Sequence, residues 1–432
     1  RLPERSLADV AAALAETDSG LADVGRELEA FSADRPVLAR HVEQLSEQAR
    51  FLEIQAGMGA SGPVAYLQGF CPAPGLEALR RAAAEHGWGL LAADPTPADA
   101  VPTLIANSRW VRPIKAVFDM LGILPGYWEM DVSFIFLLFF SLFFAILIGD
   151  AVYGFLLLGL TGLIRRKWKA APAELVPLLR ILSIATIVWG VLTGSWLGLQ
   201  NLPAPLRAAQ IGWLKEPDGK NLTFLCFLIG AIQLTLAHAW SGWRQRRSAA
   251  ALSQAGWIGI VWFMFLLACF FVLDRPLPAF WPWLLGVSLA AVALFLVPPS
   301  RLKQDWPSFC VLPFTIIGNL GDIVSYMRLY LIGSASTTLI ITFNDMMLGR
   351  GVPTFWSGLV AAAVLFAVHG LNILLNSLSV LVHGVRLNAL EFSSHLGIQW
   401  TGIRYAPFAA AARSESGGLP EAREPDAGQH AE

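Results

Sequence analysis

The segment that decides the fold is an apolar run that begins at Val132. Residues 132–148 read VSFIFLLFFSLFFAILI, and the apolar character resumes after Gly149-Asp150 over residues 151–164. A helix needs about 20 apolar residues to cross the hydrocarbon core of a bilayer. Both runs are short, so they form either two spans or one path that continues through Gly149-Asp150. The chain is therefore predicted to enter a membrane near residue 132.

The composition of the whole chain supports a membrane protein. Of its 432 residues, 55% are hydrophobic and 15% are charged, whereas a soluble domain carries about 25% charged residues. The net charge of -1 provides no basic surface for nucleic acid. The four cysteines are far apart and form no CxxC pair, which predicts buried thiols and neither a metal site nor a disulfide framework. We expect no cofactor.

Further apolar segments follow, and together with the first two they make eight candidate spans: 132–148, 151–164, 176–199, 222–243, 255–273, 281–298, 311–345 and 355–397. The last two are long, at roughly 50 and 65 Å for a straight helix. Because neither fits upright in the bilayer core, we expect both to tilt or to project beyond the lipid.

The basic residues of the loops predict the orientation of the spans. Nine follow even-numbered spans, namely Arg165, Arg166, Lys167, Lys169, Arg244, Arg246, Arg247, Arg301 and Lys303. Five lie in the opposite loops, namely Arg207, Lys215, Lys220, Arg275 and Arg350. Cytoplasmic loops are rich in Lys and Arg, so both termini are predicted to be cytoplasmic.

The part before the membrane is predicted to be a helical rod with a small α/β lobe. Apolar residues recur at helical spacing over residues 7–54, which indicates one or two helices packing as a hairpin or coiled coil. Residues 64–70 and 89–92 are predicted to be short strands, with a helix over 74–86 between them. The chain starts at Arg1 and has no signal peptide, so we expect preceding residues.

The predicted fold class is therefore mainly α, in four parts. Residues 1–110 form the cytoplasmic rod and lobe, and residues 111–131 form a linker into the membrane. Residues 132–408 form an eight-helix membrane domain with two long, tilted C-terminal helices. Residues 409–432 form a disordered tail.

The seventh span contains Arg328, which cannot lose its proton within the membrane. A charge at membrane depth costs at least about 2.5 kcal/mol, so a partner or a water-filled cavity must offset it. Small residues share its helix face (Gly318, Gly321, Ser325 and Ala335) and allow another helix to approach closely. The alternative is a structural arginine paired with Asp322 or Asp345.

The eighth span carries a continuous polar face. Steps of three and four residues separate its members, which are His369, Asn372, Asn376, Ser379, His383 and Arg386. A hydrogen-bonding seam between helices is one interpretation. A channel wall is favoured, because six polar positions that include a fixed cation need hydration.

The direction of these two spans suggests two separate polar passages. Asn319, Asp322 and Ser325 are predicted to lie on the inner side of Arg328, and residues 369–383 on its outer side. An ion that enters one passage could reach the other only on a carrier that moves past the arginine.

At these residues the chain resembles subunit a, also called subunit I, of the V-type and archaeal-type rotary ATPases, over roughly residues 60–408. The matching segments are Gly149-Asp150-Ala151-Val152-Tyr153-Gly154, Ser325-Tyr326-Met327-Arg328-Leu329, Phe343-Asn344-Asp345-Met346, His383-Gly384-Val385-Arg386-Leu387-Asn388-Ala389-Leu390-Glu391-Phe392, and the approach Pro125-Gly126-Tyr127-Trp128-Glu129-Met130-Asp131.

The resemblance implies a non-catalytic stator subunit beside a rotating ring of proteolipid helices that each carry a carboxylate. Arg328 matches the family's essential arginine, Arg386 its second arginine, and Glu391 an acid at a channel mouth or in packing. The implied partners are the rotor ring, peripheral stalk subunits that bind residues 1–110, a central-stalk connecting subunit and membrane lipid, in a prokaryotic plasma membrane. H⁺ and Na⁺ both remain possible as the transported ion.

The chain departs from some eukaryotic members at two positions, where Ser336 replaces a histidine and Asn376 a glutamate. The passage is therefore polar but poorer in titratable groups. There is no GxxxxGK[ST] loop, so no nucleotide site is expected. The alternatives are a stand-alone secondary transporter for an anionic substrate and a membrane anchor for a cytoplasmic scaffold.

Overall fold

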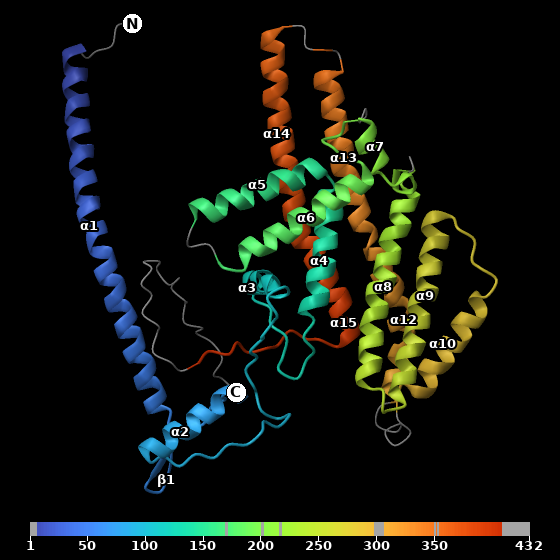
Figure 1. Ribbon diagram of the computed structural model, residues 1–432, viewed down its shortest axis with the longest axis horizontal. Helices are drawn as coiled ribbons and strands as arrows, with labels where there is room; N and C mark the ends of the chain where they lie inside the picture. The colour runs from blue at the N-terminus through green and yellow to red at the C-terminus, as the bar shows by residue number, and fades with distance from the viewer. Residues whose placement is uncertain are drawn as a thin grey trace. The chain divides into compact units, whose positions relative to one another are not determined.

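The computed structural model describes residues 7–168, 172–199, 203–215, 218–297, 306–349, 351 and 354–407. This part of the chain is mainly helical, with one two-stranded sheet. It divides into two compact units, one formed by the chain up to Asp94 and one by Pro95–Tyr405 (Figure 1). The predicted tail 409–432 and the loop cations Lys169, Arg301, Lys303 and Arg350 lie outside the described residues.

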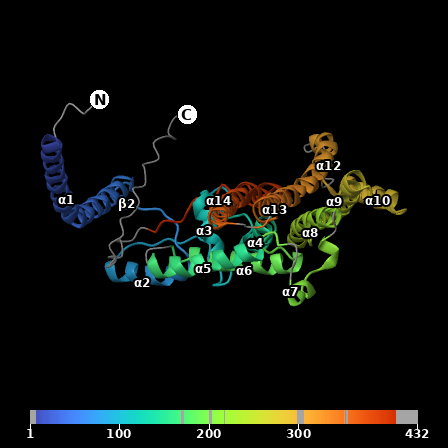
Figure 2. The same ribbon diagram turned by 90° about the horizontal axis from the view of Figure 1, so that it is seen from above.

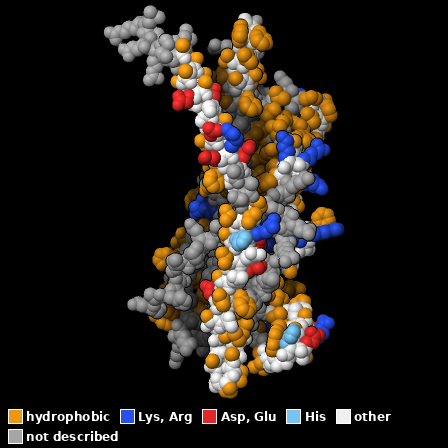
Figure 3. Space-filling view, turned by 90° about the vertical axis from the view of Figure 1, so that its left-hand side faces the viewer, with side chains coloured by type: hydrophobic (Ala, Val, Ile, Leu, Met, Phe, Trp, Pro, Cys, Tyr) orange, Lys and Arg blue, Asp and Glu red, His pale blue; other side chains and the backbone are white. Residues whose placement is uncertain are grey.

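The first unit begins with α1 (Leu7–Ala56), a single helix of 50 residues that continues through Pro36. Of the two predicted arrangements, one helix is confirmed and the hairpin of two helices is wrong, because these residues form one helix without a turn. Apolar side chains along it are exposed, among them Leu21, Val24 and Leu28. Figure 3 shows acidic and basic side chains interspersed with these apolar ones.

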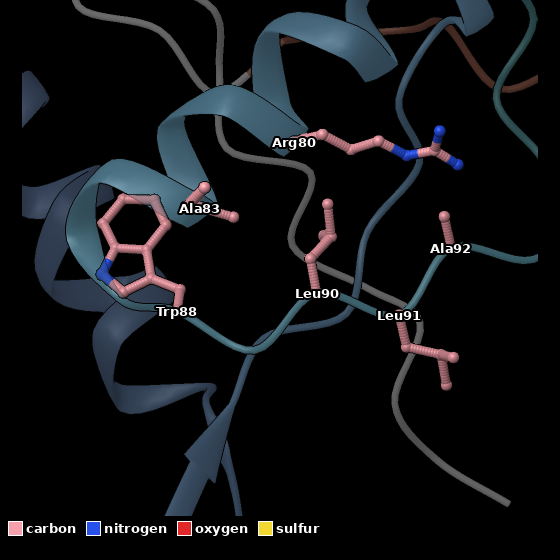
Figure 4. A pocket seen from close by; sticks show the side chains of 7 residues that line it. Arg80, Ala83, Trp88, Leu90, Leu91 and Ala92 are labelled. Atoms are coloured by element: carbon pink, nitrogen blue, oxygen red, sulfur yellow. The ribbon is translucent and has the colours of Figure 1, made fainter.

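A small lobe follows α1. Strands β1 (Gly59–Ser61) and β2 (Val64–Tyr66) pair antiparallel, and η1 (Ala73–Gly75) leads into α2 (Leu76–His86). The predicted strand over 89–92 is wrong, since these residues are irregular and the sheet has only two strands in the described chain. An apolar run of three residues after Gly89 is too short to add a strand. Together with Arg80 and Trp88 it lines a shallow pocket beside α2 (Figure 4).

The predicted linker is folded into the second unit. It forms η2 (Arg112–Ile114) and α3 (Lys115–Leu121), in which Ile114 and Phe118 are buried. The Phe118 ring lies 5.0 Å from Phe136 and 5.7 Å from Trp400, between ring centroids. These contacts fix the chain that enters the membrane domain against the chain that leaves it.

The second unit then contains apolar helices in close contact. Their bounds are α4 (Ser133–Ile148), α5 (Ala151–Lys167), α6 (Leu175–Thr193), α7 (Ala204–Ala208), η3 (Gly212–Lys215), α8 (Lys220–Arg244), α9 (Ala250–Leu273) and α10 (Trp281–Phe295). A bend of 119° separates α4 from α5. In Figures 1 and 2, α5 and α6 lie side by side and cross the direction of α4, whereas α8 and α9 run next to each other.

The two long C-terminal segments are each interrupted. The first consists of α12 (Pro307–Ser325) and α13 (Met327–Leu348), and the second of α14 (Phe355–Ser379), the π-helical turns η5 (Val380–Gly384) and η6 (Leu387–Phe392), and α15 (Ser393–Leu396).

All eight predicted spans are largely helical in the described residues. Five helices there are long and apolar enough to cross a membrane, or six when the bent pair α4–α5 is taken as one span. Each of the two long C-terminal segments, at 40 and 42 residues, counts as one candidate membrane span. Helix α10 is apolar but shorter, at 15 residues.

Candidate functional site

The helix break between α12 and α13 is held in place by Tyr326. This side chain is fully buried, and its hydroxyl donates a hydrogen bond to Oε1 of Gln233 on α8 at 2.9 Å. A Cβ atom on Gly230 would lie 2.6 Å from the Tyr326 ring, so the ring packs where α8 has no side chain. The end of α12 and the start of α13 are thus anchored to α8.

Arg328 lies in the first turn of α13, directly after this break. Its Nε donates to the backbone oxygen of Ser325 at 3.1 Å, which satisfies a carbonyl at the end of α12. Its terminal nitrogen donates to Oε1 of Glu391 at 3.0 Å, and 26% of its side chain is exposed. The alternative pairing with Asp322 or Asp345 is therefore wrong.

Glu391 is shared by the two arginines. Its Oε1 also forms an ion pair with Arg386, whose Nε lies 3.3 Å away, and only 5% of the Glu391 side chain is exposed. Its Oε2 is buried without a hydrogen-bond partner in the described chain. Two guanidinium groups that share one carboxylate retain excess positive charge, so the cluster can accept a further anion.

The π-helical turn η6 explains how Arg386 and Glu391 meet. Residues five apart on an α-helix point about 140° away from each other. A π-helix bonds each residue to the fifth one along, so such residues lie on one face. Because η6 covers Leu387–Phe392, Glu391 lies on the same face of the helix as Arg386.

A second polar chain runs from α12 to α9. Oδ2 of Asp322 lies 3.0 Å from Nε2 of His395, whose Nδ1 lies 2.9 Å from Nε2 of His238. Nδ1 of His238 is 2.8 Å from Oε1 of Gln254. Four groups from four helices therefore form one continuous hydrogen-bonded chain.

The polar face of α14 is partly a hydrogen-bonded seam. Ser336 on α13 accepts from the side-chain amides of Asn372 at 2.9 Å and Asn376 at 2.7 Å, and all three are buried. The hydroxyl of Tyr153 lies 2.6 Å from Nδ1 of His369. In this part of the predicted polar face, the contacts agree with the interpretation of a hydrogen-bonding seam between helices.

Asp150 positions Tyr153 from the bend between α4 and α5. Its carboxylate caps α5 by accepting from the backbone N–H groups of Val152 and Tyr153. It also accepts from the hydroxyl of Ser195 and the N–H of Leu197, and the Leu197 carbonyl accepts from Asn344 on α13. One buried carboxylate thus joins the bend to the loop after α6, and through that loop to α13.

The remaining predicted residues are less connected. Ser325 and Ser379 are half-buried. Asn319 is buried with its Oδ1 unpaired, and Nδ1 of His383 is buried without a partner in the described residues. The described part of the chain contains no group of three or more His, Cys, Asp or Glu side chains that could hold a metal ion.

Sequence reasoning missed several residues of these networks, among them Tyr153, Gln233, His238 and His395. Gln233 and His238 are polar residues inside the apolar run 222–243. His395 follows Glu391 by four residues, which is helical spacing. The polar residues within an apolar run and the helical spacing of Glu391 and His395 are both visible in the sequence and could have identified these residues.

Comparison with known proteins identifies the family. The chain is 33% identical to V-type ATP synthase subunit I of Borreliella burgdorferi, covering 88% of this chain and 66% of that protein. It is 31% identical to V-type ATP synthase subunit I 1 of Treponema pallidum (94% and 70%) and 24% identical to A-type ATP synthase subunit I of Methanocaldococcus jannaschii (90% and 63%). No protein-family model matches.

The chain spans about two thirds of the length of these relatives. The similarity extends over 88%, 94% and 90% of its own length in these three comparisons. The chain belongs to the subunit I family of the V-type and A-type ATP synthases.

Proposed function

We propose that this chain is the stator membrane subunit of a rotary V/A-type ATPase. It provides two aqueous half-channels separated by Arg328, and it passes H⁺ or Na⁺ to and from carboxylates of a rotor ring. It performs no ATP chemistry itself. The names of its relatives, all subunits of an ATP synthase, favour this function over a stand-alone transporter.

The observation that carries the proposal is the position of Arg328 beside an open face of small residues. A Cβ atom on Gly318 or Gly321 would meet no heavy atom within 4 Å. Arg328 is partly exposed, and its one counter-charge is shared with Arg386. A rotor helix can therefore approach this face closely and present its carboxylate to a guanidinium that is incompletely neutralised.

The charge of Arg328 explains the coupling. A ring carboxylate that reaches it is held ionised, because an adjacent cation favours the charged form. The carboxylate must therefore release its ion before it passes and take up another afterwards. Asn319, Asp322 and Ser325 line one half-channel. The other half-channel is lined by polar residues of α13 and of the second long segment, where water would replace some of the hydrogen bonds between these helices. These residues are Ser336, His369, Asn372, Asn376, Ser379 and His383.

The assembly follows from the same proposal. Eight helical segments would lie in a prokaryotic plasma membrane with both termini cytoplasmic. The first unit would bind the peripheral stalk and hold the subunit still, and the central-stalk connecting subunit would approach from the same side. The long helix α1 supports this, since apolar side chains along it, among them Leu21, Val24 and Leu28, are exposed.

The test is the variant Arg328→Ala in the assembled complex, reconstituted into lipid vesicles. We expect ATP-driven ion uptake to be abolished while subunit composition is unchanged. Arg165→Ala, at the end of α5, is the control and should transport normally. Uptake by the Arg328→Ala complex at the rate of the unmodified complex would refute the proposed function.

A further inference from the structure

With the Gln254 oxygen toward His238, the hydrogen-bonded chain of Asp322, His395, His238 and Gln254 takes one proton more than two neutral imidazoles supply. Each of its three contacts needs one bridging proton. The first contact joins the Gln254 oxygen to His238, the second joins Nε2 of His238 to Nδ1 of His395, and the third joins His395 to the Asp322 oxygen. Two neutral imidazoles carry two. The third bridging proton lies in the contact between His395 and Asp322.

The two ends of this chain face different surroundings. Asp322 has 33% of its side chain exposed, on the open face that contains Gly318 and Gly321. Gln254 lies in the second turn of α9 and is half-buried, close in sequence to the exposed turn at 245–249. The chain thus joins the open face of α12 to the end of the α8–α9 pair that carries Arg246 and Arg247.

The middle of the chain is shielded. His238 is 5% exposed and stacks on Trp257 with ring centroids 6.0 Å apart, and the His395 side chain is 9% exposed. Shielding of this kind excludes bulk water, and it leaves direct transfer between hydrogen-bonded groups as the path for a proton.

We propose that Gln254, His238, His395 and Asp322 form a proton relay between the basic α8–α9 turn and the open face of α12. This rests on the proposed function and deepens it, because it names H⁺ as the ion carried on this side. Imidazole rings pass a proton by exchanging N–H bonds, whereas Na⁺ needs a set of oxygen ligands, and the relay offers only the Asp322 and Gln254 side-chain oxygens.

Each transfer balances. The transfer starts with both rings protonated on Nε2 and the Gln254 NH₂ group donating to Nδ1 of His238. A proton from water beside Gln254 then binds Nδ1 of His238, whose Nε2–H bond breaks as an N–H bond forms on Nδ1 of His395. The Nε2–H bond of His395 breaks as an O–H bond forms on Asp322, which passes this proton to the rotor carboxylate. Both rings are then protonated on Nδ1, the state in which the Gln254 oxygen accepts from His238, and each returns to the Nε2 tautomer before the next transfer. The Gln254 amide serves both states, since its oxygen accepts from His238 and its NH₂ group can donate.

The experiment uses His238→Ala in the assembled complex in vesicles, with ATP-driven proton uptake followed by a pH-sensitive dye. We expect uptake to fall by roughly 10-fold or more, within the range of general acid–base catalysis. Added imidazole should restore it. Pyrazole, which has the same shape but is a much weaker base, should not. His41→Ala, on α1, is the matched control and should pump normally.

A second variant distinguishes loss of the relay from misfolding. His395→Gln keeps a side chain that can hydrogen-bond to both neighbours but cannot carry the proton, and we expect it to lower uptake to a similar extent. Normal pumping by either variant, or equal rescue by pyrazole and imidazole, would overturn the relay. So would ATP-driven Na⁺ uptake that persists when a protonophore collapses the proton gradient.

Arg328→Ala separates this inference from the proposed function. If Arg328→Ala is inactive while both histidine variants pump normally, the relay is wrong and the stator function stands. If Arg328→Ala itself pumps normally, the proposed function fails together with the relay.

Discussion

At the scale of single residues, the site depends on one carboxylate that neutralises two cations. Glu391 is nearly fully buried and contacts Arg328 and Arg386 through the same oxygen. Removing one partner of a buried ion pair is costly, because the other charge stays in a poorly solvated position. Glu391 therefore stabilises the junction of the two long segments, and under the proposed function it would also set the charge that a rotor carboxylate meets.

We expect Glu391→Gln to destabilise the protein by about 1–3 kcal/mol, less than for a fully buried pair, since it leaves the partly buried Arg328 and the half-exposed Arg386 without a counter-charge. Thermal unfolding of the purified complex should show a lower melting temperature. Asp345→Asn removes an exposed carboxylate from α13 and should leave the melting temperature unchanged. Equal melting temperatures for Glu391→Gln and the unmodified complex would contradict this role.

The arginines of the site could be predicted from the sequence, but their partner could not. Arg328 and Arg386 are charges within apolar segments, and that contrast identifies them directly. Glu391 lies five residues after Arg386, a spacing that points away on a regular α-helix. The pairing depends on the π-helical turn, which has no sequence signal of its own. For the same reason the alternative interpretation of Arg328 named Asp322 and Asp345 as partners and did not name Glu391.

At the scale of helices, the bend between α4 and α5 requires close contact with α6. A Cβ atom on Gly190 would lie 2.1 Å from the backbone nitrogen of Ala151, so α6 approaches the start of α5 at van der Waals distance. Asp150 lies at the same place and binds the loop after α6. The bend is thus fixed by a glycine and a buried carboxylate.

We expect Gly190→Ala to destabilise the membrane unit, because the added methyl group would collide with backbone that cannot move aside. Gly159→Ala is the matched control, since a Cβ atom there meets nothing within 4 Å. It should be neutral or stabilising by up to about 1 kcal/mol through helix propensity. Thermal unfolding of both variants measures the difference, and a Gly190→Ala protein as stable as the Gly159→Ala protein would show that α6 can shift.

Hydropathy predicted the helices well and the local details less well. Each apolar run is helical because a bilayer or an apolar core leaves the backbone no other way to satisfy its hydrogen bonds. The break at Tyr326 lies inside such a run and depends on Gly230 of another helix, which hydropathy does not register. The strand predicted over 89–92 was wrong, since the pattern is too short to specify pairing.

At the scale of the whole molecule, α1 presents apolar residues at steps of three and four, the spacing of a coiled-coil seam. Several of them, including Leu21 and Leu28, are exposed. Under the proposed attachment to a peripheral stalk, this seam would dock another helix of the assembled stator.

We expect the double variant Leu21→Glu and Leu28→Glu to weaken that attachment, because charges in the seam oppose burial. Co-purification with the complex should recover fewer peripheral stalk subunits. Arg26→Glu, which changes charge on the opposite face of α1, is the control and should recover them fully. Full recovery with the double variant would exclude the seam as the contact.

The wide turn η6 also sets the rotation of the chain that follows it. Deleting Ala389 would leave Arg386 and the shared acid four residues apart, a spacing that a regular α-helix already places on one face. The cost would fall on α15, whose His395 would turn relative to Asp322 and His238, so the length of this short stretch should matter for those contacts.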